Sequence, residues 1–261
     1  MKKTVIIIGL ILLLISGAVL SGCTPVLISE KNGPTTTREY DFTDFIGIEI
    51  GHAFELEVTP SDTYQITVTA GKSVLDHIDV SKVGSTLKID MDHWLFNWHS
   101  SPKVTITMPD LQELNLSGAC KGNARGFKSS HDFKLLLSGA SELDLDMEVG
   151  GLKSEISGAS QVAGYLKASS SDIELSGASQ SELKGSGGNI KLDTSGASQA
   201  NLIDFAVDDA GIELDGASHA SLTINGKMDV SLSGVSSLEY KGNPILGNLD
   251  ISGASSIKQI P

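Results

Sequence analysis

The segment SEISGASQVAGYLKASSSDIELSGASQSEL, residues 154–183, contains the tetrapeptide Ser-Gly-Ala-Ser twice, first at Ser157 and again at Ser176. The tetrapeptide or a near variant begins at eight positions, which are Ser117, Ser138, Ser157, Ser176, Ser195, Asp215, Ser233 and Ser252. Successive copies are 21, 19, 19, 19, 20, 18 and 19 residues apart. Self-similarity at a fixed period predicts a solenoid of stacked, similar coils.

The residues around each tetrapeptide have the periodicity of β-strands. The positions one and three before it are aliphatic in seven of the eight copies, as in Ile173 and Leu175, and alternation resumes after it, as in Leu143 and Leu145. A spacing of two is strand periodicity. We therefore predict an all-β fold, a right-handed parallel β-helix with coils of about 19 residues and Ser-Gly-Ala-Ser corners, because parallel crossovers are generally right-handed.

The composition of the tetrapeptide fits a sharp corner. Glycine tolerates positive φ and close backbone approach. We expect the alanine to point into a narrow interior vertex, and the serine hydroxyls to bond one another or the corner backbone. Catalytic serines are disfavoured, because no His or Lys recurs beside them and a nucleophile would not be copied eight times.

The N-terminus has the features of an exported lipoprotein. Residues 1–22 combine Lys2 and Lys3 with a nearly all-apolar run, which predicts a signal peptide. Leu20-Ser21-Gly22-Cys23 resembles the bacterial lipobox, so we expect lipid attachment at Cys23; an uncleaved membrane anchor is the alternative. Residues 23–38 are predicted to be a flexible tether. Cys120 occupies a slot that is Ser in every other repeat, which favours a small filler over a reactive thiol.

Residues 39–110 lack the tetrapeptide but alternate clearly, as in Phe54-Glu-Leu56-Glu-Val58. We predict that this β-strand region begins and caps the β-helix of residues 111–261, because a bare end would pair with another molecule. A cluster of bulky side chains within it is either a structural cap or a recognition surface, and a metal site there is disfavoured because no third ligand is marked. The cluster comprises His93, Trp94, Phe96, Trp98 and His99.

Two outward columns are predicted from the repeat. The residues two before the corners include four consecutive carboxylates, Glu155, Glu174, Asp193 and Glu213. They form either a solvated acidic face that blocks edge association or a column that takes Ca²⁺ or a cationic surface. We expect no cofactor and no resident metal. Gln161, Gln180, Gln199 and His219 are predicted to form a second column, a structural ladder. The formal net charge of −13 argues against nucleic-acid partners.

Met108-Pro109-Asp110-Leu111, which runs into Leu114-Asn115-Leu116-Ser117-Gly118-Ala119 and the repeats, resembles the putative auto-transporter adhesin, head GIN domain family. The resemblance covers roughly residues 40–260 and implies an exported β-helix without established catalytic residues. It favours a non-enzymatic, lipid-anchored cell-envelope protein that binds a polysaccharide or an envelope or host protein. A polysaccharide lyase or hydrolase, or a structural or regulatory envelope component, remains the alternative.

Overall fold

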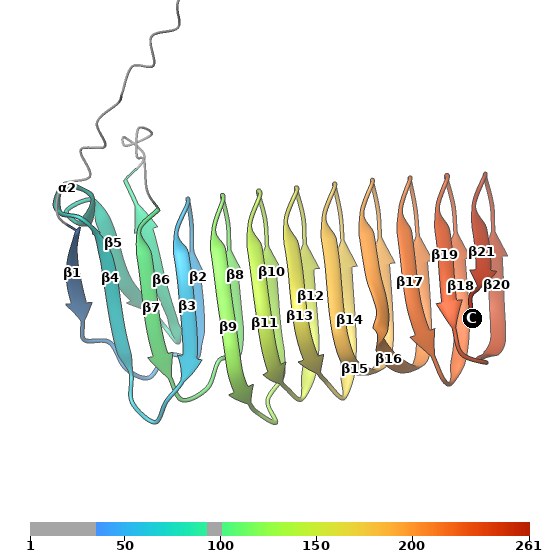
Figure 1. Cartoon of the computed structure of the whole chain (residues 1–261), viewed down its shortest axis with the longest axis horizontal. Helices are drawn as coiled ribbons and strands as arrows, with labels where there is room; N and C mark the ends of the chain where they lie inside the picture. Colours follow the sequence, from blue (N-terminus) through green and yellow to red (C-terminus); the bar gives the residue numbers. More distant parts are fainter. Residues whose placement is uncertain (1–34, 93–100) are drawn as a thin grey trace, which may run out of the picture. The chain divides into compact units, whose positions relative to one another are not determined.

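The computed structural model describes residues 35–92 and 101–261, within a compact unit that spans Gly33–Pro261. The described strands form one continuous 21-stranded sheet, because β15 and β16 run through both of its faces. This sheet is folded into two facing layers of mainly parallel strands, one built from the strands before the corners and one from the strands after them (Figure 1). We call them the leading sheet and the trailing sheet. The prediction of an all-β solenoid with coils of about 19 residues is confirmed. The described residues contain no helix long and apolar enough to cross a membrane.

The leading sheet is, in spatial order, β5 (Ile78–Val83), β6 (Thr86–Met91), β2 (Gly47–Ile50), β8 (Glu113–Leu116), β10 (Phe133–Leu137), β12 (Gly151–Ile156), β14 (Ser170–Leu175), the second parts of β15 (Gln180–Thr194) and β16 (Gln199–Leu214), β18 (Lys227–Leu232) and β20 (Ile245–Ile251).

The trailing sheet is β1 (Thr35–Tyr40), β4 (Gln65–Gly71), β7 (Lys103–Met108), β3 (Glu55–Pro60), β9 (Lys121–Lys128), β11 (Glu142–Glu148), β13 (Gln161–Lys167), the first parts of β15 and β16, β17 (His219–Ile224), β19 (Ser237–Lys241) and β21 (Ser256–Gln259). A short helix, α2 (Lys72–Leu75), follows β4.

The stack of coils begins earlier than the sequence repeat does. β2 pairs in parallel with β8, and β3 pairs in parallel with β9, so residues 47–60 form a coil whose corner is 51–54. β6 and β7 add strands before this coil, on β2 and β3 respectively. Antiparallel β5 then ends the leading sheet, and antiparallel β4 and β1 end the trailing sheet. Antiparallel strands thus close the N-terminal side of the solenoid.

The corners stack directly on one another. From the second tetrapeptide onward, the amide N–H of the residue after each corner glycine donates to the carbonyl of the preceding corner glycine, as in Ala159 to Gly139 O (2.8 Å) and Ala178 to Gly158 O (2.8 Å). The corner glycines have positive φ, for example 73° at Gly158. A Cβ at Gly158 would also collide with the main chain of Gly139. Both requirements exclude any residue other than glycine.

The expected position of the corner alanine is wrong. Ala159 and Ala178 are exposed, and Val235, which replaces alanine in one copy, is 67% exposed. The final serine of the tetrapeptide lies inside instead, because the glycine turn directs the next side chain outward and the following one inward. Ser198 is buried and its hydroxyl donates to the carbonyl of Ser195 at 2.8 Å. The vertex therefore selects a small side chain that can satisfy a corner carbonyl.

Candidate functional site

The four carboxylates predicted to form an outward column lie side by side on successive strands of the leading sheet. Glu155 of β12 pairs with Glu174 of β14, Glu174 with Asp193 of β15, and Asp193 with Glu213 of β16. Ser231 and Asp250 continue the row on β18 and β20. Parallel strands are roughly 4.8 Å apart. The row is therefore a line of closely spaced negative charge, and we call it the acidic column.

Lysines four residues before the corners neutralise part of the acidic column. Lys191 Nζ lies 2.6 Å from Asp193 Oδ2, and Lys153 Nζ lies 3.7 Å from Glu155 Oε1. The hydrogen bond to Asp193 raises the pKa of Lys191 above its ordinary value. Within the described part of the chain, Glu174 and Glu213 have no cation within 4 Å. These two carboxylates leave negative charge available to a ligand.

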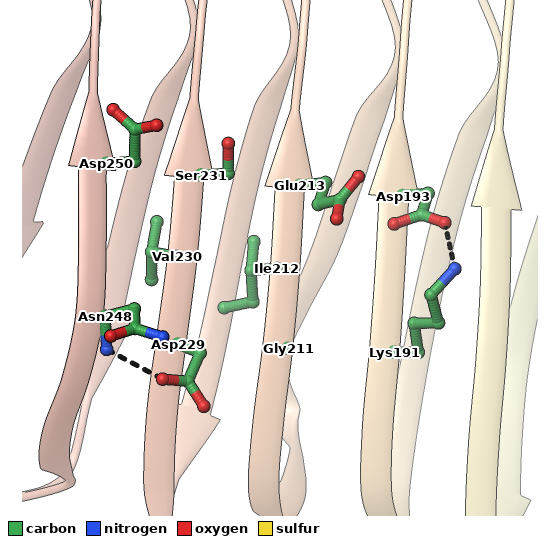
Figure 2. A pocket seen from close by; sticks show the side chains of 10 residues that line it. All are labelled: Lys191, Asp193, Gly211, Ile212, Glu213, Asp229, Val230, Ser231, Asn248 and Asp250. Carbon is green, nitrogen blue, oxygen red and sulfur yellow. Dashed lines mark hydrogen bonds and ion pairs between the residues drawn. The ribbon is translucent and has the colours of Figure 1, made fainter.

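A shallow depression of about 250 Å³ lies on this face at Gly211 (Figure 2). Gly211 pairs with Lys191 on one side and Asp229 on the other, and an added Cβ at position 211 would meet nothing within 4 Å. The absent side chain therefore leaves a notch in the row of side chains. Its rim carries the carboxylates of Asp193, Glu213, Asp229 and Asp250.

The carboxylate of Asp229 on this rim is held by two hydrogen bonds. Lys227 Nζ donates to its Oδ2 at 2.6 Å, and the backbone N–H of Asn248 donates to its Oδ1 at 2.7 Å. These bonds, with the lysine first, lower the pKa of Asp229. This carboxylate is therefore charged at neutral pH and held in a fixed orientation.

A second depression of about 330 Å³ adjoins the first along the acidic column. It is lined by three pairs of polar residues that repeat from coil to coil: Glu155 and Ser157, Glu174 and Ser176, and Asp193 and Ser195. Each coil thus presents a carboxylate and a corner hydroxyl in the same relative position. Such a row can accept and donate hydrogen bonds to a ligand that itself repeats along its length.

The described residues contain no group of three or more His, Cys, Asp or Glu side chains arranged to hold a metal ion. A line of carboxylates also differs from the enclosing set of six to eight oxygens that Ca²⁺ takes. The chemistry that the acidic column offers is hydrogen bonding to hydroxyl groups and attraction of cationic groups.

Two other predicted sites lie outside the described residues. Cys23 precedes residue 35, and His93, Trp94, Phe96, Trp98 and His99 fall between residues 92 and 101. Their flanking strands are β6 and β7. β6 pairs with β2 and β7 pairs with β3, and the corner 51–54 connects β2 to β3. The roles of these residues stay predictions.

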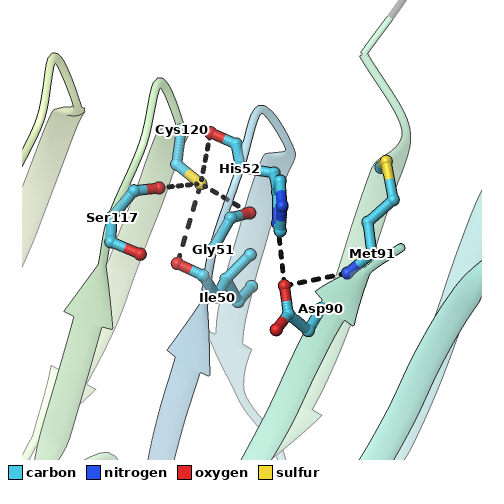
Figure 3. A network of polar contacts seen from close by, with 7 residues as sticks. All are labelled: Ile50, Gly51, His52, Asp90, Met91, Ser117 and Cys120. Atoms are coloured by element: carbon cyan, nitrogen blue, oxygen red, sulfur yellow. Dashed lines mark hydrogen bonds and ion pairs between the residues drawn. The ribbon is translucent and has the colours of Figure 1, made fainter. Parts of the chain in front are cut away.

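The first corner holds a polar network (Figure 3) that the repeat alone does not mark. Cys120 Sγ lies 3.3 Å from Ser117 O and 3.5 Å from Gly51 O, and burial raises the pKa of its thiol. His52 Nδ1 lies 2.7 Å from Asp90 Oδ1, which also accepts from the backbone N–H of Met91 at 2.8 Å. The network joins β6 to the first complete coil, and its role is structural.

Sequence reasoning placed the acidic column but missed the notch. Gly211, Asp229 and Asn248 all lie four residues before a corner, in the row next to the acidic column. In the sequence, the residues four before successive corners are Lys153, Asp172, Lys191 and then Gly211, so the missing side chain at position 211 is visible in the repeat. A glycine in the middle of such a row of long side chains predicts a gap in the surface.

The family model described as putative auto-transporter adhesin, head GIN domain, matches residues 44–169 and 152–244. Among proteins of curated function, none matches this sequence.

Several solved structures share the fold. A crystal structure described as a putative lipid binding protein from Parabacteroides distasonis has a TM-score of 0.80 and 20% identity, and the match covers 88% of this chain and 98% of that one. A putative adhesin from Parabacteroides merdae has a TM-score of 0.82 and 16% identity, with coverage of 88% and 98%. A putative adhesin from Bacteroides fragilis has a TM-score of 0.65 and 19% identity, with coverage of 87% and 97%. At these identities the likeness establishes the β-solenoid fold.

Proposed function

The chain belongs to the putative auto-transporter adhesin, head GIN domain family, and from this premise we propose that it is a non-enzymatic adhesin of the cell envelope. Its ligand is a polysaccharide, and its binding surface is the acidic column of the leading sheet. The proposal rests on one observation, the repeated carboxylate and hydroxyl pairs that line the column.

A repeating row favours a repeating ligand. Each pair offers acceptor oxygens on the carboxylate and a donor and acceptor on the serine hydroxyl. Glu174 and Ser176 lie one coil from Asp193 and Ser195, so the same set of hydrogen bonds recurs at strand spacing. A hydroxyl-rich polymer without acidic groups matches this row, whereas a polyanion is repelled by it.

The proposed attachment to the membrane is a lipid on Cys23. The apolar run before Leu20-Ser21-Gly22-Cys23 supports export, and acyl chains on this cysteine would anchor the mature chain at roughly 0.8 kcal/mol per buried CH₂ group. Metabolic labelling of the full chain with a clickable fatty acid tests the anchor. Labelling that is lost in Cys23→Ser and retained in Cys120→Ser is the expected result.

A polysaccharide-active enzyme is the alternative that uses the same face. A glycosidase needs a carboxylic acid whose pKa is raised so that it can donate a proton. On this face, the hydrogen bonds from Lys227 and from the backbone N–H of Asn248 lower the pKa of Asp229, which is the opposite of what a general acid needs.

The decisive experiment uses a soluble chain that begins at Gly33. It measures the binding of this chain to neutral, cationic and acidic polysaccharides, and each polysaccharide is tested with Ca²⁺ and with chelator. Glu174→Gln and Glu213→Gln remove charge from the acidic column without breaking an ion pair. Each is expected to weaken binding about tenfold for a cationic polymer and less for a neutral one. Glu182→Gln, on the exposed face of β15 in the trailing sheet, is the matched control.

Equal loss of binding in the Glu182→Gln control, or no binding by any polysaccharide, would contradict the proposal. The second result would favour a protein partner or a structural role in the envelope. Turnover of a polysaccharide, seen as new reducing ends or unsaturated products, would establish the enzyme alternative.

A further inference from the structure

The last described coil exposes apolar side chains that equivalent positions in earlier coils bury. Leu249 is 44% exposed and Ile251 43%, whereas their partners on β18, Val230 and Leu232, are 4% and 1% exposed. Ile245 and Leu246 are 74% and 52% exposed. In the described part of the chain, β20 pairs only with β18 and β21 only with β19 (Figure 1). Both sheets therefore end here in strands with an unpaired edge.

The opposite end of the solenoid differs. Antiparallel β5 and β1 close the two sheets there, and Phe45, Leu75 and Ile78 are buried. Val83 is the one large apolar side chain among the described residues of that region that is exposed. Among residues 35–92 and 101–261, apolar surface and open strand edges thus coincide only at β20 and β21, where natural sheets usually carry protection.

We propose that two copies of the chain associate end to end through β20 and β21 as a closed two-fold dimer. An occupant of this end has to offer two strands about 10 Å apart with apolar side chains between them. The same end of a second copy offers both. The described residues at the other end of the solenoid expose little apolar surface. The pairing therefore joins like ends and closes, and it does not propagate into a filament.

A closed two-fold dimer can form in two ways, with β20 beside β20 of the second copy or with β20 beside its β21. The charges on these strands favour the second arrangement. If β20 of one copy meets β20 of the other, Asp250 approaches its own counterpart and Lys258 approaches its own. If β20 meets β21 of the second copy, the antiparallel register that sets Ile251 opposite Ile257 also sets Asp250 opposite Lys258. Asp250 and Lys258 lie on outward faces, and symmetry forms this opposite-charge pair twice.

Existing contacts support the second arrangement. Lys258 Nζ lies 3.3 Å from Glu239 Oε1, and the lysine side chain keeps 69% exposure. Asp250 of the second copy would lie beyond Lys258 on the trailing sheet. The lysine would then stand between two carboxylates, Glu239 of its own chain and Asp250 of the second copy. The strands contribute main-chain hydrogen bonds, and Leu249 and Ile251 of each copy leave water.

The test is sedimentation velocity of the chain that begins at Gly33, over a concentration series. This chain keeps the whole core, whose first member is Phe45. A dimer is expected. Asp250→Lys and Lys258→Asp are each expected to raise the dissociation constant at least tenfold, and the double variant Asp250→Lys/Lys258→Asp to restore it to within about threefold. Leu249→Lys is expected to leave a monomer with cooperative unfolding.

Val83→Lys, at the other end of the solenoid, is the matched control and is expected to leave the dimer unchanged. A monomer at every concentration overturns the proposal, as does an assembly that keeps growing with concentration. A dimer that resists both charge reversals, or one that both reversals weaken without rescue in the double variant, overturns the pairing of β20 with β21.

Discussion

His52 lies directly before Gly118 in the stack of corners, and its main chain occupies the space that a Cβ at position 118 would need. The amide N–H of Ala119 donates to the carbonyl of His52, as each later corner alanine donates to a glycine. His52 itself has φ of 66°, the conformation that glycine holds in the other corners. Residues 51–54 are therefore a ninth corner whose glycine has become histidine.

The tolerance of histidine at position 52 follows from its neighbours. A corner glycine is needed both for positive φ and because the preceding corner lies against it. Asp90, on the neighbouring strand β6, binds the imidazole of His52. The positive φ at this position costs a non-glycine residue roughly 1–2 kcal/mol.

The stacked corners predict that Gly158→Ala is strongly destabilising. The added Cβ meets the main chain of Gly139 and also suffers the positive φ of 73°. We expect a loss of about 2–4 kcal/mol in the free energy of unfolding, measured by chemical denaturation. Gly211→Ala is the matched control. Position 211 has open space and no positive φ, so alanine there is expected to be neutral or to stabilise by roughly 0.5–1 kcal/mol.

The orientation of the tetrapeptide makes a second prediction. Ser198→Val places a branched side chain in the closed vertex and removes the hydroxyl that bonds Ser195 O. A loss of about 2–3 kcal/mol is expected. Ala197→Val is expected to change stability by less than about 0.5 kcal/mol, because Ala197 is exposed and valine occurs naturally in the same slot at 235.

Denaturation of both variants side by side is the measurement. A larger loss for Ala197→Val than for Ser198→Val would show that the alanine, and not the serine, faces the interior.

The solenoid could be predicted because its signals are local and repeated. Ile173 and Leu175 have strand periodicity, and the tetrapeptide after them recurs at nearly constant spacing. The corner at 51–54 could not be recognised, because it keeps only Ala53 of the tetrapeptide and lies 66 residues before Ser117. The inserted strands β4 to β7 hide the period, although β2 and β8 are neighbours in space.

The inward direction of the last serine was also hidden. Period-2 alternation predicts side-chain direction only within a strand. Counting in steps of two from Leu175 does reach the buried Ser179, but the turn at Gly177 lies between them, where the alternation of a strand is not expected to hold. The acidic column was predictable because Glu174 lies within a strand, next to the buried Leu175.

Asp110 predicts a stability that falls in acid. It follows β7 and is hydrogen bonded to Gln112 Nε2 at 2.8 Å and His131 Nδ1 at 2.8 Å, with 23% of its side chain exposed. Partial burial alone would raise its pKa, but hydrogen bonds from Gln112, Ser129 and His131 outweigh burial and lower it. The carboxylate is thus favoured in the folded state, and its contribution is complete above the unfolded pKa of about 3.9.

This contribution is lost as the pH falls from about 4 through the lower folded pKa. Asp110→Asn is expected to cost about 1–2 kcal/mol at pH 7 and to flatten the fall of unfolding free energy below pH 4. Denaturation at a series of pH values measures both. Asp208→Asn, at an exposed position on β16, is the control. If the unfolding free energy of Asp110→Asn falls below pH 4 as steeply as that of the natural sequence, a group other than Asp110 causes the loss of stability in acid.

Cys120 is predicted to be chemically inert in the folded chain. Its side chain is 0% exposed, its Sγ lies 3.3 Å from Ser117 O, and burial raises the pKa of its thiol, so little of the reactive thiolate forms at neutral pH. In the chain that begins at Gly33 it is the sole cysteine, which makes a thiol-reactive dye a specific probe. We expect labelling at pH 8 to be at least a hundredfold slower in buffer than in denaturant. Cys120→Ser is expected to change the unfolding free energy by less than about 1 kcal/mol, because serine fills the same vertex in the next coil, where Ser141 Oγ donates to Ser138 O at 3.0 Å. Fast labelling of the folded chain would instead indicate that the first corner opens without global unfolding, and the rate of labelling would then measure the free energy of that opening.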